Sequence, residues 1–413
     1  MSWRIAAAVG SLLLLVAAVA GAFVLVRGGG PSDPISKAAA PFTYDLTGWE
    51  VRHLLNRWLY KIGHLFDDGP SVEEENETIQ RYFALAAEVT SLEREIAEDG
   101  DESLRSPLEE KRNEHRRLEN KVEDILEKRL STVAQDEGLT TSLPLFSNVR
   151  FVFPPLDFEF DQPPRLLVIS PRDRISLDRS ILLRRGLTGE QVTALEGETA
   201  AAGASSLVVN LGGIATYPST VPEYDSYESA LETAAHEWLH HYLFFHPLGS
   251  HYFDNETLRT LNETVANIGG REIAHLVQQR FPLPHSNSVA AADGPREEPR
   301  IDFRAEMHEL RLEVDRLLSE GKIAEAEALM EQKRKFLAEN GFYIRKINQA
   351  YFAFHGLYAD TPASSSPIGP KMQELRRLSP SLGDFIRSVA EITSEEDLDR
   401  LLAERAVESL TPP

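Results

Sequence analysis

Apolar residues recur every three to four positions along most of this chain, which is the spacing of amphipathic helices. The pattern predicts a helix that begins near Tyr227 and ends near His246, because Pro247 follows. A second helix is predicted over residues 255–279. Short apolar runs at 165–170 and 206–211 predict strands. Helices therefore dominate, and the sequence predicts an α+β fold, mostly helical, with a small sheet.

Two pairs of helices are predicted to fold back on themselves. Residues 73–98 and 107–135 each carry one apolar stripe and many charges, so we expect an acidic antiparallel hairpin with coiled-coil-like packing. A solvated arm is the simpler interpretation, and a surface for a protein partner is the alternative. A second pair, 301–319 and 322–340, breaks at Gly321, and we expect part of it to roof the catalytic cleft.

The N-terminal stretch at 5–26 is apolar and flanked by Arg4 and Arg27. A bilayer core needs about 20 such residues, so the stretch predicts a retained transmembrane helix. The chain would then be a single-pass protein of the cell membrane with an extracytoplasmic catalytic domain. A cleaved signal peptide ending at Ala20 is the alternative. We divide the chain into an anchor at 1–27, a linker at 28–41, a helical region with the acidic hairpin at 42–140, and a catalytic domain at 141–413 with a helical insertion at 300–340.

One short segment carries most of the chemical information. Residues 236–240 read HEWLH, and helical spacing places His236 and His240 on one face, where both imidazoles can bind one zinc ion. Glu237 can reach a water on that ion and accept its proton as general base. Two ordinary histidines on a helix are the competing interpretation, which the strong helical pattern around them disfavours.

A catalytic zinc usually takes three protein ligands and leaves one position open. Glu263, in the second predicted helix, and His246 are the two candidates. His246 lies six residues after His240, where the metzincin peptidases place their third His, but that pattern has a Gly where this chain has Leu243, and a left-handed backbone is costly for leucine. We therefore predict Glu263 as the third ligand.

These motifs resemble those of the gluzincins, the thermolysin-like zinc peptidases. HEWLH is followed 22 positions after His240 by Asn262, in the pattern Asn262-Glu263-x-x-Ala266. More narrowly, the pair is similar to that of the bacterial predicted membrane-associated aminopeptidases. The resemblance covers about residues 165–280 and implies a zincin-like core, with His236, His240 and Glu263 as zinc ligands and Glu237 as the base. The long helical additions lie outside the shared core.

Gluzincin mechanisms use a downstream Tyr or His to hydrogen-bond the oxyanion. If residues 344–358 form one helix, Tyr351 and His355 share a polar-aromatic face with Tyr358, and we assign Tyr351 and His355 to this role. A half-buried aromatic stripe is the alternative. Residues 212–217, just before the zinc helix, are a candidate edge for pairing with an extended peptide, with a plain loop as the alternative.

Composition narrows the function further. The net charge of −22 over 413 residues argues against nucleic acid as a partner, and the absence of cysteine excludes disulfides and thiolate ligands. We expect a membrane-anchored zinc peptidase that acts on peptide or protein substrates, with exo- and endopeptidase action both open. The alternative is a non-catalytic membrane-anchored scaffold whose zinc site is structural or vestigial.

Overall fold

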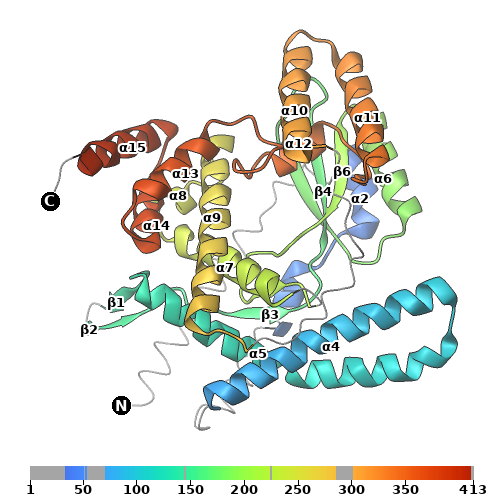
Figure 1. Cartoon of the computed structure of the whole chain (residues 1–413). Helices are drawn as coiled ribbons and strands as arrows, with labels where there is room; N and C mark the ends of the chain where they lie inside the picture. Colours follow the sequence, from blue (N-terminus) through green and yellow to red (C-terminus); the bar gives the residue numbers. More distant parts are fainter. Residues whose placement is uncertain are drawn as a thin grey trace.

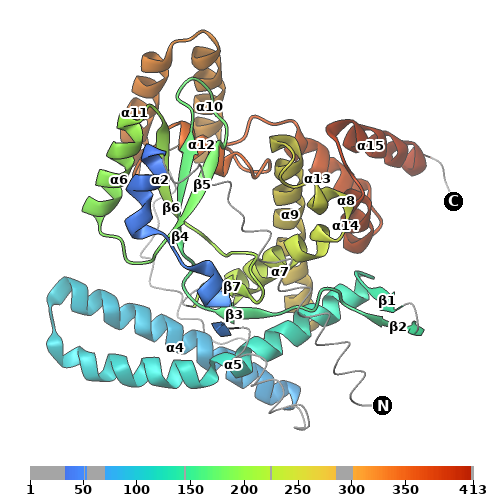
Figure 2. The same cartoon turned by 180° about the vertical axis from the view of Figure 1, so that it is seen from behind.

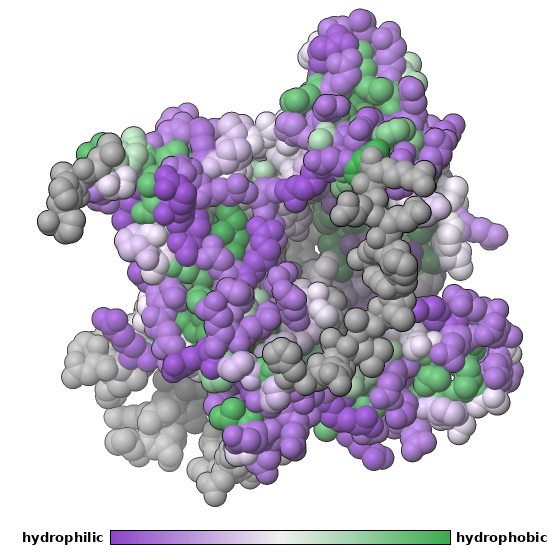
Figure 3. Space-filling view, viewed as in Figure 1, coloured by the Kyte–Doolittle hydropathy of each residue, from purple (hydrophilic) through white to green (hydrophobic). Residues whose placement is uncertain are grey.

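The computed structural model describes residues 33–50, 52–53, 70–143, 146–223, 226–284 and 301–410 (Figure 1). Helices make up most of this described chain, and the strands form one three-stranded sheet and two strand pairs. The prediction of a mostly helical α+β fold with a small sheet is confirmed. The face seen in Figure 3 is largely hydrophilic, as the high content of charged residues requires.

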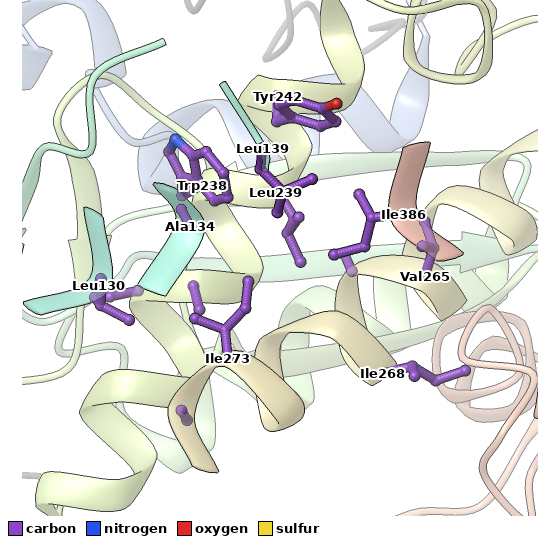
Figure 4. Packing of buried hydrophobic residues seen from close by; sticks show 14 of the residues in the cluster. Leu130, Ala134, Leu139, Trp238, Leu239, Tyr242, Val265, Ile268, Ile273 and Ile386 are labelled. Carbon is purple, nitrogen blue, oxygen red and sulfur yellow. The ribbon is translucent and has the colours of Figure 1, made fainter. Parts of the chain in front are cut away.

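Two long helices form the centre of the molecule. α7 (Tyr227–Phe244) begins after Ser226, whose side chain accepts a hydrogen bond from the backbone N–H of Ser229, and α9 (Glu256–Arg280) is capped in the same way by Asn255. Apolar side chains of the two helices, among them Leu239, Val265 and Ile273, are buried in one cluster (Figure 4). Both predicted helices are confirmed to within two residues at each end.

The three-stranded sheet lies beside this helical centre. Its order is β5-β4-β6, with β5 (Arg179–Leu183) and β6 (Ser205–Asn210) both antiparallel to β4 (Arg165–Ser170). One face packs against α2 (Pro34–Ala39) and α6 (Gly189–Ala201). The other face packs against α12 (Gln349–His355). The sheet therefore sits between two helical layers (Figures 1 and 2).

Smaller elements complete the frame. The strand pairs are β1 (Thr141–Leu143) with β2 (Phe146–Phe151), which is antiparallel, and β3 (Phe158–Phe160) with β7 (Ser219–Val221), which is parallel. Short helical turns are η1 (Ala40–Phe42), η2 (Glu102–Leu104) and α8 (Pro247–Ser250). The C-terminal helices are α13 (Ile368–Leu378), α14 (Leu382–Ala390) and α15 (Glu395–Leu410), of which α13 and α14 contact α9.

The predicted acidic hairpin is present as α4 (Val72–Asp99) and α5 (Arg105–Asp136). Gly100, at φ 68°, ends α4 in the left-handed conformation that glycine adopts at no steric cost. Arg81 on α4 pairs with Glu114 on α5 at 2.7 Å, as antiparallel packing requires. The base of the hairpin is not a free arm, because Ile79 and Leu126 belong to the same buried cluster as the α7 and α9 residues. Only the end near Gly100 projects from the core (Figure 1).

The second hairpin is α10 (Phe303–Ser319) and α11 (Ile323–Glu339), joined through Gly321 at φ 75°. It has its own apolar cluster, which also includes Ile347 and Phe352 beside α12. No residue of this hairpin lines the cavity described below, so the structure does not support its role as a roof.

No helix within the described ranges is long and apolar enough to cross a membrane. This finding runs against the predicted single-pass membrane protein with an extracytoplasmic domain, and we do not retain the transmembrane assignment. The apolar stretch at 5–26, on which that assignment depended, lies outside the described residues.

Candidate metal centre

Three of the predicted site residues converge at one point. The Nε2 atoms of His236 and His240 lie 3.1 Å apart, and Oε2 of Glu263 lies 3.7 Å and 3.5 Å from them, respectively. A tetrahedral zinc ion with bonds near 2.1 Å places neighbouring donor atoms about 3.4 Å apart. The donor set and its spacing therefore fit zinc.

The two central helices create this convergence. His236 and His240 lie one turn apart on α7, so their rings project to the same side. α9 crosses α7 closely because Gly270 has no side chain: a Cβ there would lie 3.0 Å from the carbonyl oxygen of Glu232 and 3.1 Å from the backbone nitrogen of His236. The crossing brings Glu263 to the imidazoles.

Asn262 orients one of the two imidazoles. Its Oδ1 lies 2.7 Å from Nδ1 of His240, and both side chains are buried. An amide oxygen can only accept, so Nδ1 donates to it and Nε2 is the nitrogen left to bind a metal. The Asn of the NExxA pattern thus has a structural role that sequence reasoning had not assigned.

Glu263 is held by a second partner. The hydroxyl of Tyr252 donates to its Oε1 at 2.6 Å, which leaves Oε2 facing the histidines. Burial alone would raise the pKa of Glu263, but the two imidazoles hold it well below its usual value. Burial would likewise lower the pKa of His240, yet the Glu263 carboxylate outweighs it and raises the pKa to about 9. The site therefore favours positive charge between these three side chains.

Glu237 faces the same cavity without joining the ligand group. It is 7 % exposed, and burial raises its pKa despite the nearby imidazoles. A carboxylate with a raised pKa accepts a proton more readily near neutral pH. Gly213 makes room for it, since a Cβ at that position would lie 2.5 Å from Oε1 of Glu237.

The cavity has a volume of about 520 Å³. Its walls come from the β5 strand and the loop before it, from residues 211–215, from α7, from residues 252–259, and from the segment after α12. Ile214, in the predicted peptide-pairing edge, lines this cavity and exchanges hydrogen bonds with Thr220 at 3.1 and 3.2 Å. The backbone there is thus partly paired within the protein.

The predicted oxyanion donors occupy different places. The rings of Tyr351 and His355 contact each other, with centroids 4.3 Å apart and planes tilted by 46°, and neither residue lines the cavity. Tyr358 does line it, with its ring centroid 6.2 Å from that of His236. Burial raises the pKa of Tyr358 well above its usual value, so its hydroxyl stays protonated and can donate. The sequence thus predicts the correct segment for an oxyanion donor, but the two residues that it assigns to this role, Tyr351 and His355, lie outside the cavity lining.

His246, the rival third ligand, lies outside the group. Its Nδ1 is 3.0 Å from Oε1 of Glu391, on the side of α14, and it does not line the cavity. Glu263 is the residue that the structure brings to the histidines.

Comparison of this chain with protein-family models, with curated proteins and with solved structures finds no match. The assignment of a function therefore depends on the geometry of the site and on the motif resemblance.

Proposed function

We propose that this protein is a zinc-dependent peptidase that hydrolyses peptide bonds in the cavity beside α7. The observation that carries the proposal is the convergence of His236, His240 and Glu263 at zinc-compatible distances, with a fourth buried side chain, Glu237, facing the same space. A purely structural zinc site has a closed set of four ligands and no need for such a carboxylate.

Each side chain has a defined task in this proposal. A zinc ion, when bound, would supply Lewis acidity that lowers the pKa of a water to about 7. Glu237 accepts the proton of that water and passes it to the departing amine. The hydroxyl of Tyr358 donates to the oxygen that becomes negative on the substrate carbonyl. Asn262 and Tyr252 hold the ligands in orientation.

The resemblance to gluzincins supports the same proposal. HEWLH and the Asn262-Glu263-x-x-Ala266 pattern fall on two adjacent helices, α7 and α9, where they face each other. We extend the proposal to a zincin-like core formed by these helices and the β5-β4-β6 sheet.

A digest of a mixed peptide library tests the proposal. We expect the purified full chain to hold about one zinc, to cleave peptides, to lose cleavage on treatment with a chelator and to regain it with added zinc. His236→Ala and Glu263→Ala should lose both zinc and cleavage. His246→Ala is the matched control and should retain both, because His246 lies outside the site. Full zinc content without chelator-sensitive cleavage would instead favour the non-catalytic scaffold.

A further inference from the structure

Two arginines line the cavity without a task in the proposed reaction, Arg179 and Arg259. Arg259 lies on α9 four residues before Glu263, so the two residues share a face of the helix about 6 Å apart along its axis. The side chain is half-buried, and its guanidinium lies over the ring of Tyr252, 5.6 Å from the centroid. The same tyrosine donates to Glu263. Arg259 is therefore held against the cavity wall next to the metal centre.

The guanidinium of Arg259 makes no hydrogen bond or ion pair within the part of the chain that the structure describes. Arg179, which also lines the cavity, differs in this respect, because its Nη1 lies 2.7 Å from a carboxylate oxygen of Asp33. A guanidinium offers five N–H donors in a planar fork that matches a carboxylate. The nitrogen atoms of Arg259 reach solvent, so water satisfies these donors until a carboxylate replaces it.

Acidic residues near Arg259 do not fill this role. Asp254 and Glu256 line the same wall, but neither forms an ion pair with Arg259. Burial raises the pKa of Glu256. The charge of Arg259 lowers this pKa by Coulomb attraction, without a hydrogen bond between the two side chains. Arg259 lines a cavity of about 520 Å³, which has room for a short peptide.

We propose that Arg259 binds the free carboxylate at the C-terminal end of a short peptide. This inference rests on the proposed peptidase function. The Arg259 guanidinium lies over the ring of Tyr252, whose hydroxyl is 2.6 Å from the ligand Glu263, and an extended chain advances about 3.3–3.6 Å per residue. A carboxylate paired with Arg259 therefore lies one or two residues beyond the bond that is cut. The enzyme removes single residues or dipeptides from the C-terminus, and a bidentate pair with Arg259 selects the terminus.

Two synthetic peptide libraries that differ only at the C-terminus, free acid against amide, test this inference with the zinc-loaded full chain. We expect the wild type to cut the free-acid library within two residues of the end, and the amidated library about 10- to 100-fold more slowly. Arg259→Ala should raise KM for the free-acid library by a similar factor with little change in kcat, and should abolish the preference. Arg259→Lys should recover part of it, since the charge remains but the fork is lost.

Arg280→Ala is the matched control, because Arg280 lies on the same helix with its side chain 60 % exposed and far from the cavity lining. It should keep the wild-type preference. Equal rates on both libraries, or a preference that survives Arg259→Ala, would overturn the inference while leaving the peptidase proposal intact. The wild type could instead prefer amidated peptides that carry Asp or Glu near the cut bond, with this preference lost in Arg259→Ala. That result would mean that Arg259 binds an acidic side chain of the substrate and not its C-terminal carboxylate. Cleavage of neither library would overturn the peptidase proposal itself.

Discussion

Asn262, which directly precedes the proposed ligand Glu263, has its Oδ1 2.7 Å from Nδ1 of His240. This contact fixes the tautomer in which Nε2 is free to bind a metal. We expect Asn262→Ala to weaken zinc affinity by about 10- to 100-fold, measured by competition with a chelator of known affinity. Asn262→Asp keeps an acceptor and should retain zinc. Unchanged affinity in the alanine variant would show that the contact does not orient the ligand.

Gly212 and Gly213, which precede β7, allow a test of how tightly the Glu237 carboxylate is positioned. A Cβ at Gly213 would lie 2.5 Å from Oε1 of Glu237 and 2.6 Å from Thr233, whereas a Cβ at Gly212 would meet no atom within 4 Å. Gly213→Ala should therefore displace the Glu237 carboxylate and lower kcat by up to about 100-fold, with zinc content unchanged. Gly212→Ala should behave as wild type in steady-state assays. Equal kcat values for the two variants would count against the positioning of Glu237.

Substitution by phenylalanine distinguishes the candidate oxyanion donors. Tyr358→Phe removes a hydroxyl in the cavity and should lower kcat by about 100-fold or more, while KM changes little. Tyr351→Phe alters a ring that contacts His355 and does not line the cavity, so its kcat should remain near the wild-type value. The reverse pattern would return the role to Tyr351.

Glu119 on α5 should make stability depend on pH. Burial, together with the negative charges of Glu223, Glu159 and Asp161, raises its pKa to about 8, although the positive charge of Arg116 lowers it. Its folded pKa exceeds the unfolded value near 4.5, so the folded state holds more protons between these values and loses stability as pH rises through that window.

Glu119→Gln, which cannot ionise, should therefore raise the melting temperature by roughly a few degrees at pH 8 and leave it nearly unchanged at pH 4. Thermal unfolding of both proteins at the two pH values is the measurement. An equal shift at both pH values would mean that ionisation of Glu119 is not the cause.

Local patterns in the sequence predict α7, α9 and the strands β4 and β6, but not β5, which also lines the cavity. The spacing of apolar residues sets the limits of α7 and α9 to within two residues. His236 and His240 come together because four residues make one helical turn, and this needs no tertiary information. The pairing of Glu263 with them was predicted from its motif and from the backbone cost at Leu243.

Features that depend on where chains cross were not predicted. Gly270 permits the close approach of α9 to α7, but a single glycine in a helix gives no sign of its neighbour. The sequence does not single out Tyr358 as the oxyanion donor, because it predicts one helix over 344–358. In the structure α12 ends at His355, and Tyr358, in the segment after it, lines the cavity. A continuous helix over 344–358 would place Tyr351, His355 and Tyr358 on one face. Because the helix ends at His355, only Tyr358 of these three residues lines the cavity.

Hydrolysis of a peptide library by zinc-loaded Glu237→Gln, compared with zinc-loaded wild type, tests the central claim most directly. The amide keeps the shape of the carboxylate, and Glu237 is not among the three converging donors, so zinc content should stay at about one per chain. Because the amide cannot accept the proton, we expect cleavage to fall by about 100- to 10,000-fold. A Glu237→Gln protein that holds zinc and cleaves at the wild-type rate would contradict the assignment of this site as a peptidase centre with Glu237 as its base.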